Sequence, residues 1–138
     1  MAEITGRINE AAAALATLED AIDKSERSLL ERDGMILRLI YTFEAVWKAS
    51  QQLLAAREGI AVASPNATIR AVRRLGWMSD EDAKAAFDIA DDRNLAVRMY
   101  RGRIGEEIQE RLAAPTALLR RWLAELQRRA TPDDPPPV

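Results

Sequence analysis

Apolar residues recur every three or four positions near the start of the chain, and this spacing limits the fold to packed helices. The steps between them are four, three, four, three and four, which is the repeat of one helix face. A strand would need strict alternation, and no stretch of the chain shows such a pattern long enough to build a sheet. The sequence therefore predicts an all-α, antiparallel up-and-down four-helix bundle with an extra short helix. The residues of this first repeat are Ile4, Ile8, Ala11, Leu15, Leu18 and Ile22.

Capping residues suggest where the helices begin and end. The first helix is expected over about residues 3–24, and a polar connection follows over 25–32. Asp33 is a good N-cap for a helix over 34–58, which Gly59 would end. Ser64 and Pro65 open a short third helix that stops before Gly76, and we expect this helix to cap the bundle.

A fourth helix is expected from Ser79 to about Tyr100, because its first turn is acidic. A fifth begins near Ile104, and Pro115 should break or kink it. We expect one domain over residues 1–130. Residues 131–138 hold four of the six prolines, and this composition predicts a disordered tail.

Composition excludes several kinds of chemistry. The chain has no Cys and no His, so thiol nucleophiles, disulfides and the usual zinc ligands are excluded. The commonest general base near neutral pH is also missing. The net charge is −2, which does not describe a strongly basic nucleic-acid protein. We expect a cytoplasmic protein with no leader, membrane span, metal or other cofactor.

A basic strip lies at the C-terminal end of the fourth predicted helix and just beyond it. It contains Arg93, Asn94, Arg98 and Tyr100, and four arginines occur between residues 93 and 103. The planar guanidinium suits phosphate, so the strip can bind a nucleotide or an RNA backbone. The alternative is a solvated face with Arg93 paired to Asp88 or Asp92, and spacing alone favours this alternative.

A second cluster contains Tyr41, Glu44 and Lys48, which lie off the apolar stripe of the second helix. These residues can line a site or a subunit interface. The alternative is an ordinary solvated ion pair, which spacing alone favours. Leu37 lies beside them, and an apolar residue off the main stripe can indicate a second contact surface.

Two stretches resemble a known family. Residues 38–48 read Arg-Leu-Ile-Tyr-Thr-Phe-Glu-Ala-Val-Trp-Lys, which is similar to the pattern R-x-x-Y-T-F-E-x-x-W-K. Ser64-Pro65, Arg70-Ala71, Gly76, Asp92-Arg93-Asn94 and Tyr100 follow in the family's order. The chain thus resembles the nucleotidyltransferase substrate-binding protein family of the HEPN superfamily, which includes the HepT toxins. The resemblance implies a helical bundle that forms a homodimer and pairs with a small nucleotidyltransferase.

The resemblance also implies a site at the basic strip. HEPN ribonucleases carry an R-x4-H motif, which Arg93 opens here, and Asn94 and Tyr100 match its polar residue and its Tyr. Arg98 stands where the family has His. A guanidinium remains protonated and cannot act as a general base, although it can hold phosphate. We therefore expect a non-catalytic subunit that binds a nucleotide or RNA phosphate. The alternatives are a HEPN ribonuclease toxin with an altered site and a helical interaction module without a ligand.

Overall fold

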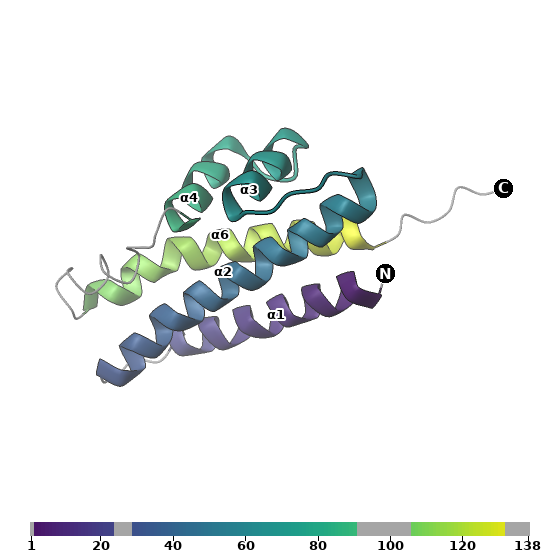
Figure 1. Ribbon diagram of the computed structural model, residues 1–138. Helices are drawn as coiled ribbons and strands as arrows, with labels where there is room; N and C mark the ends of the chain where they lie inside the picture. The colour runs from purple at the N-terminus through teal and green to yellow at the C-terminus, as the bar shows by residue number, and fades with distance from the viewer. Residues whose placement is uncertain (1, 24–28, 91–105, 132–138) are drawn as a thin grey trace.

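The computed structural model describes residues 2–23, 29–90 and 106–131 (Figure 1). These residues form helices and no strand, which confirms the all-α prediction. The helices are α1 (Ala2–Asp23), α2 (Leu29–Glu58), α3 (Pro65–Arg74), α4 (Asp80–Ala90) and α6 (Glu106–Ala130).

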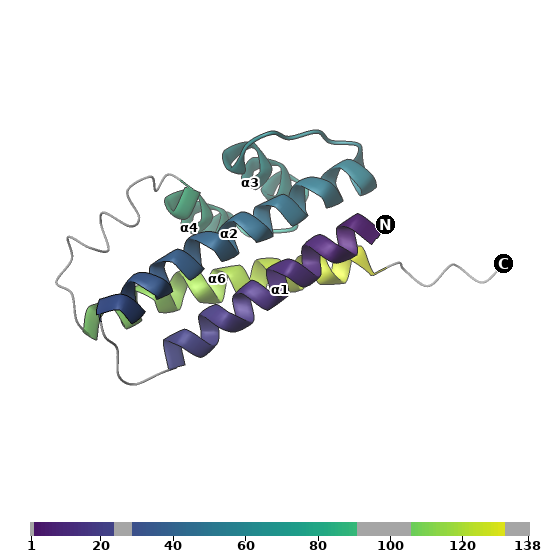
Figure 2. The same ribbon diagram turned by 60° about the horizontal axis from the view of Figure 1, so that its bottom comes forward.

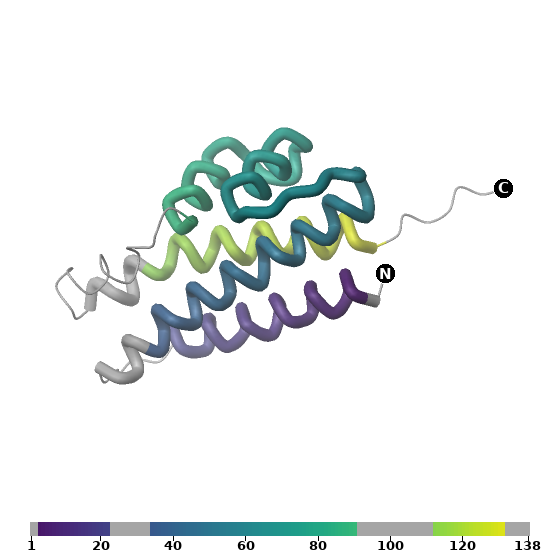
Figure 3. The backbone as a smooth tube through the Cα atoms, viewed as in Figure 1, coloured from purple at the N-terminus to yellow at the C-terminus, as the bar shows by residue number. Residues whose placement is uncertain are grey.

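Three long helices form the body of the bundle. Helix α1 runs antiparallel to α2 and α6 and contacts both of them (Figure 2). Helices α3 and α4 lie on the other side of α2 and α6 (Figure 3). Helix α3 lies along α2 and against α4, so the two short helices together complete the bundle.

The predicted apolar stripes meet in one core. The first repeat on α1 is buried except for Ile22, which is partly exposed. Phe43 of α2 meets Trp122 of α6 edge-to-face, with 6.1 Å between the ring centroids. The Trp122 indole also donates a hydrogen bond of 2.8 Å to the Ser50 hydroxyl. These contacts join α2 to α6 at the centre of the molecule.

The capping residues lie where local chemistry predicts them. Gly59 ends α2 with a φ of 66°, a left-handed conformation that other residues adopt at a cost. The Ser64 hydroxyl accepts a hydrogen bond of 3.1 Å from the Ala67 amide, and Pro65 occupies the first turn of α3. Gly76, with a φ of 76°, follows α3 and starts the turn to α4.

The predicted start of α2 is wrong. The helix begins at Leu29, so residues 29–32 are helical and Asp33 lies inside the helix instead of capping it. Leu29 and its three successors are strong helix formers, and their propensity extends the helix past Asp33 and Gly34. A single Gly inside a helix costs only about 1 kcal/mol, which a long packed helix tolerates.

The predicted break at Pro115 is also wrong, because α6 is one continuous helix. A proline inside a helix costs about 3 kcal/mol or more. The turns on both sides bury Leu112, Leu118 and Leu119 completely or nearly so, and each buried leucine returns about 1.5–3 kcal/mol. Burial therefore outweighs the lost backbone hydrogen bond. The predicted end of the fourth helix near Tyr100 and the predicted tail over 132–138 lie outside the described residues.

Candidate functional site

The basic strip lies outside the described residues. Arg93, Asn94, Arg98 and Tyr100 all fall between the last residue of α4, Ala90, and the first residue of α6, Glu106. Their role as a phosphate-binding site stays a prediction from the sequence.

The second predicted cluster lies on the outer side of α2. Glu44 and Lys48 are each a little under half exposed, and 3.7 Å separates the Lys48 Nζ from the Glu44 Oε2. An exposed ion pair one turn apart contributes a few tenths of a kcal/mol. The pair thus has the geometry of an ordinary solvated ion pair, and both of its charged groups remain partly exposed to solvent.

Tyr41 connects this cluster to α1. Its side chain is exposed, and its hydroxyl donates a hydrogen bond of 3.1 Å to the Glu10 carboxylate. This hydrogen bond is the main reason that the pKa of Tyr41 is raised above its ordinary value. The hydroxyl therefore stays protonated at neutral pH and is not an activated nucleophile.

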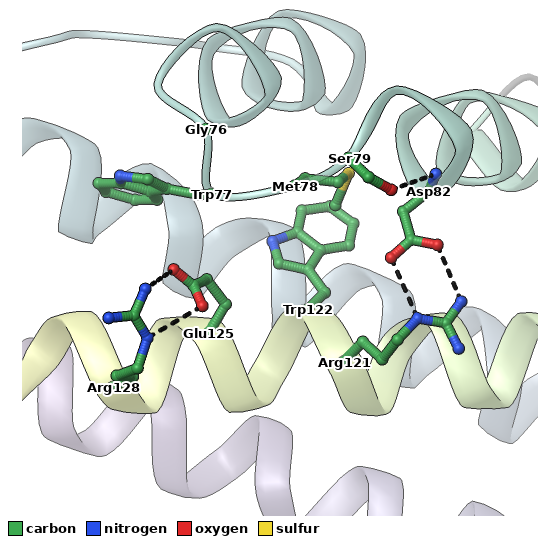
Figure 4. A pocket seen from close by; sticks show the side chains of 9 residues that line it. All are labelled: Gly76, Trp77, Met78, Ser79, Asp82, Arg121, Trp122, Glu125 and Arg128. Atoms are coloured by element: carbon green, nitrogen blue, oxygen red, sulfur yellow. Dashed lines mark hydrogen bonds and ion pairs between the residues drawn. The ribbon is translucent and has the colours of Figure 1, made fainter.

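A pocket that the sequence did not reveal lies between the α3–α4 turn and α6 (Figure 4). Its volume is about 410 Å³. Trp77 of the turn and Trp122 of α6, both almost fully buried, line this pocket together with the charged side chains of Asp82, Arg121, Glu125 and Arg128 (Figure 4). The lining residues are Gly76, Trp77, Met78, Ser79, Asp82, Arg121, Trp122, Glu125 and Arg128.

Charged groups in this pocket pair with one another. Arg121 donates two hydrogen bonds to Asp82, at 3.0 and 2.8 Å, and so joins α6 to α4. Glu125 accepts hydrogen bonds from Arg128 and from the Nε of Arg129, the latter at 2.7 Å. The bond from Arg128 is the main reason that the pKa of Glu125 is lowered. Both carboxylates are thus engaged with arginines of α6, and neither is left free as a general base.

A second pocket of about 300 Å³ lies on the other side of Trp77. The Arg129 guanidinium lies over the indole ring, 5.4 Å from its centroid, in a cation–π contact. Arg57 donates a hydrogen bond of 2.8 Å to the Ala130 carbonyl at the end of α6. Arg57 thus interacts with the negative end of α6, while Arg129 is engaged by Trp77 and Glu125, so the charges of both arginines are used in contacts within the protein.

Metal binding and membrane insertion have no support in the described part of the chain. No three carboxylate, His or Cys side chains there gather closely enough to hold a metal ion. None of the helices described is long and apolar enough to cross a bilayer.

Comparison with models of known protein families shows to which family this chain belongs. A family model described as "nucleotidyltransferase substrate binding protein like" matches residues 6–128. The chain belongs to this family. The match confirms the resemblance drawn from residues 38–48, and it extends over nearly all of the helical part.

A solved relative shares the family fold. A protein from Thermus thermophilus, known from its crystal structure, shares 41% sequence identity with this chain. The two structures are similar, with a TM-score of 0.75. The alignment covers 86% of this chain and 99% of the Thermus protein. None of the curated proteins matches the chain.

Proposed function

We propose that this protein is a non-catalytic binding subunit that forms a homodimer and pairs with a small nucleotidyltransferase. In this complex it holds a nucleotide or an RNA phosphate for the partner enzyme. The observation that carries the proposal is the family match over residues 6–128. The family's description names substrate binding and gives no reaction to this subunit itself.

The absence of catalysis is supported by the sequence at position 98. The chain has no His, and Arg98 stands at the His position of the related ribonucleases. Metal-independent RNA cleavage needs a group that takes and returns a proton, and a guanidinium does neither at working pH. Arg93, Asn94 and Arg98 retain donors that suit phosphate oxygens, and Tyr100 adds a hydroxyl.

Pairing with the enzyme is tested by co-expression. The chain is produced together with a small nucleotidyltransferase encoded beside its gene, and the two are separated by size-exclusion chromatography. We expect them to elute together with micromolar or tighter affinity. Separate elution of two folded proteins at micromolar concentration would count against the pairing.

Phosphate binding is tested by thermal unfolding with nucleoside triphosphates. A ligand that binds the native state raises the melting temperature. We expect a rise for the wild type, a smaller one for Arg98→Ala, and no such reduction for Arg74→Ala. Arg74 is an exposed arginine of α3 and serves as the matched control. Equal shifts for both variants would remove Arg98 from the site.

A second candidate function is a ribonuclease toxin of a toxin–antitoxin pair, which the retained Arg93, Asn94 and Tyr100 favour. The two candidates differ in their behaviour with RNA in the presence of a chelator. We expect the wild type to leave RNA intact. Cleavage by the wild type, lost in Arg93→Ala, would establish the toxin function instead.

A further inference from the structure

The second pocket lies where α2 and α6 end, and its lining carries an excess of positive charge. Helix α2 ends at Glu58 and α6 ends at Ala130. The C-terminal end of a helix carries a partial negative charge, so arginines are favourable there. Three arginines line the pocket, however, and only one glutamate does. The charged lining residues are Arg57, Glu58, Arg128 and Arg129.

Two of these arginines keep hydrogen-bond donors that the described residues do not use. Arg57 donates to the Ala130 carbonyl through one Nη nitrogen. Arg129 donates to Glu125 through Nε, while its guanidinium lies over the ring of Trp77. A guanidinium has five N–H donors in a planar fork, so the remaining Nη groups of both arginines suit a carboxylate. The pocket can therefore accept an acid.

Trp77 adds a buried donor without an acceptor at the same pocket. It is 4% exposed, and its indole N–H has no hydrogen-bond partner among the described residues. In Figure 4 the indole nitrogen lies at the end of the ring that is nearer Arg128 than Trp122, which is the direction of the second pocket. A buried donor without a partner is costly, so this end of the bundle gains from an acceptor.

The chain leaves α6 at the rim of this pocket and then carries two acids. Thr131 lines the pocket, and its amide and hydroxyl donate to the Gln127 carbonyl at 3.1 and 2.8 Å. Pro132 follows, and a proline cannot continue the helix. Asp133 and Asp134 come next, so their Cα atoms are at most roughly 7 and 11 Å from that of Thr131. Both acids are thus within reach of the pocket.

We propose that Asp133 and Asp134 fold back into the second pocket and pair with Arg57 and Arg129. The negative charge of this acidic pair complements the positive charge of the lining. A short tether holds the acids at an effective concentration on the order of millimolar, which favours them over a free carboxylate. A docked carboxylate also brings acceptor oxygens to the side on which the Trp77 N–H lies. The disordered tail expected from composition is then limited to the residues beyond Asp134.

The docked acids neutralise the arginines at this end of the bundle. A nucleotide or an RNA phosphate that approached Arg57 and Arg129 would have to displace a tethered carboxylate. The acidic pair thus acts against anion binding at this end. This role does not depend on the binding function proposed above, and its test uses the isolated full chain.

Proton–nitrogen correlation NMR of the indole groups tests the docking. The signals of Trp77 and Trp122 are those lost in the respective Phe variants. We expect Asp133→Asn/Asp134→Asn to shift the Trp77 signal and to leave that of Trp122, which is hydrogen-bonded in the core, unchanged. Asp20→Asn removes an exposed acid from α1 and is the matched control, which should shift neither signal.

Salt provides a second measurement that needs no substitution. In about 1 M salt, charges are screened within roughly 3 Å, which weakens the pairing of exposed groups. The wild-type Trp77 signal should then move to the position that it has in Asp133→Asn/Asp134→Asn. The signal of that variant should move little, because its docking is already lost.

A spin label locates the acidic segment relative to the pocket. Because the chain has no Cys, Pro136→Cys carries a single nitroxide. The label should broaden the Trp77 indole signal, and the broadening should be smaller when Asp133→Asn/Asp134→Asn is added.

A Trp77 signal that is the same in the wild type and in Asp133→Asn/Asp134→Asn would overturn the proposal. Broadening that neither salt nor neutralisation of the acids reduces would also overturn it. An equal shift in Asp20→Asn would do the same, because the response would then be to net charge and not to the pocket.

Discussion

The hydrogen bond from Trp122 to Ser50 joins α6 to α2 inside the core, and Ser50→Ala removes it selectively. Trp122 is 2% exposed and Ser50 is fully buried. The indole donates to the Ser50 hydroxyl over 2.8 Å, and that hydroxyl donates to the Val46 carbonyl over 3.1 Å. Alanine takes away the acceptor and leaves a buried indole N–H without a partner.

The expected loss of unfolding free energy is about 1–3 kcal/mol, the cost of a stranded buried donor. The second hydrogen bond adds little, because the Val46 carbonyl also accepts from a backbone amide one turn later in α2. The serine oxygen is small, so the void that it leaves adds only a minor term.

Urea unfolding followed by circular dichroism measures this loss, and a double-mutant cycle with Trp122→Phe assigns it. Phenylalanine has no N–H, so Ser50→Ala should cost little in that background, and the coupling should reach about 1 kcal/mol. If Ser50→Ala unfolds within about 0.5 kcal/mol of the wild type, or loses equally in both backgrounds, the hydrogen bond does not have this role.

Further predictions concern glycines, a cap and an ion pair. Gly59→Ala should lower the unfolding free energy by about 1 kcal/mol, whereas Gly34→Ala, inside α2 with open space around it, should raise it by roughly 0.5–1 kcal/mol. Equal signs in thermal unfolding would contradict the backbone argument. Ser64→Ala should cost about 1 kcal/mol in urea unfolding, since it removes the α3 cap. Because Arg128 lowers the pKa of Glu125, the stabilising contribution of that carboxylate is present above the ordinary glutamate pKa and is lost as the pH falls through the lowered one. Glu125→Gln should therefore be less stable than the wild type at neutral pH, and this difference should vanish in acid; a constant difference across a pH series would refute it.

Much of the fold was predictable because it depends on local chemistry. The repeat on α1 fixes one buried face whatever the partner helices are. Gly59 and Ser64 mark an end and a start because a left-handed turn and an N-cap each need particular residue types. These signals lie within a few residues of the feature that they specify.

Two boundaries were not predictable from local signals, since packing and propensity decided them together. Asp33 has the side chain of a cap, but the helix formers before it continue α2 to Leu29. Pro115 has the chemistry of a helix breaker, but the leucines around it are buried in the core, and α6 packs against α1, α2 and α4. A local preference of a few kcal/mol yields when a longer element buries more apolar surface.

The candidate site was predictable only in part. The position of Tyr41, Glu44 and Lys48 on one outer face follows from helical spacing, and the structure places them there. The pocket at Trp77 joins residues 76–82 to residues 121–128, and helical periodicity carries no information about such distant contacts. The ion pair between Asp82 and Arg121 could be predicted only once the packing of α4 against α6 was known.

The described arginines of α6 and α3 differ in whether a carboxylate already engages their charges. The described arginines near the middle and end of α6 are engaged with carboxylates: Arg120 with Glu19, Arg121 with Asp82, and both Arg128 and Arg129 with Glu125. A guanidinium that already forks onto a carboxylate must give up that bond before it can hold a phosphate, which weakens binding by the free energy of the pair. Arg70 and Arg74 of α3 form no such pair with the described residues, and they lie outside both pockets. Arg70 and Arg74, outside both pockets, have no enclosed site around them, whereas the sequence places Arg93, Asn94, Arg98 and Tyr100 within eight positions, so a phosphate site is still predicted at the strip and not at α3.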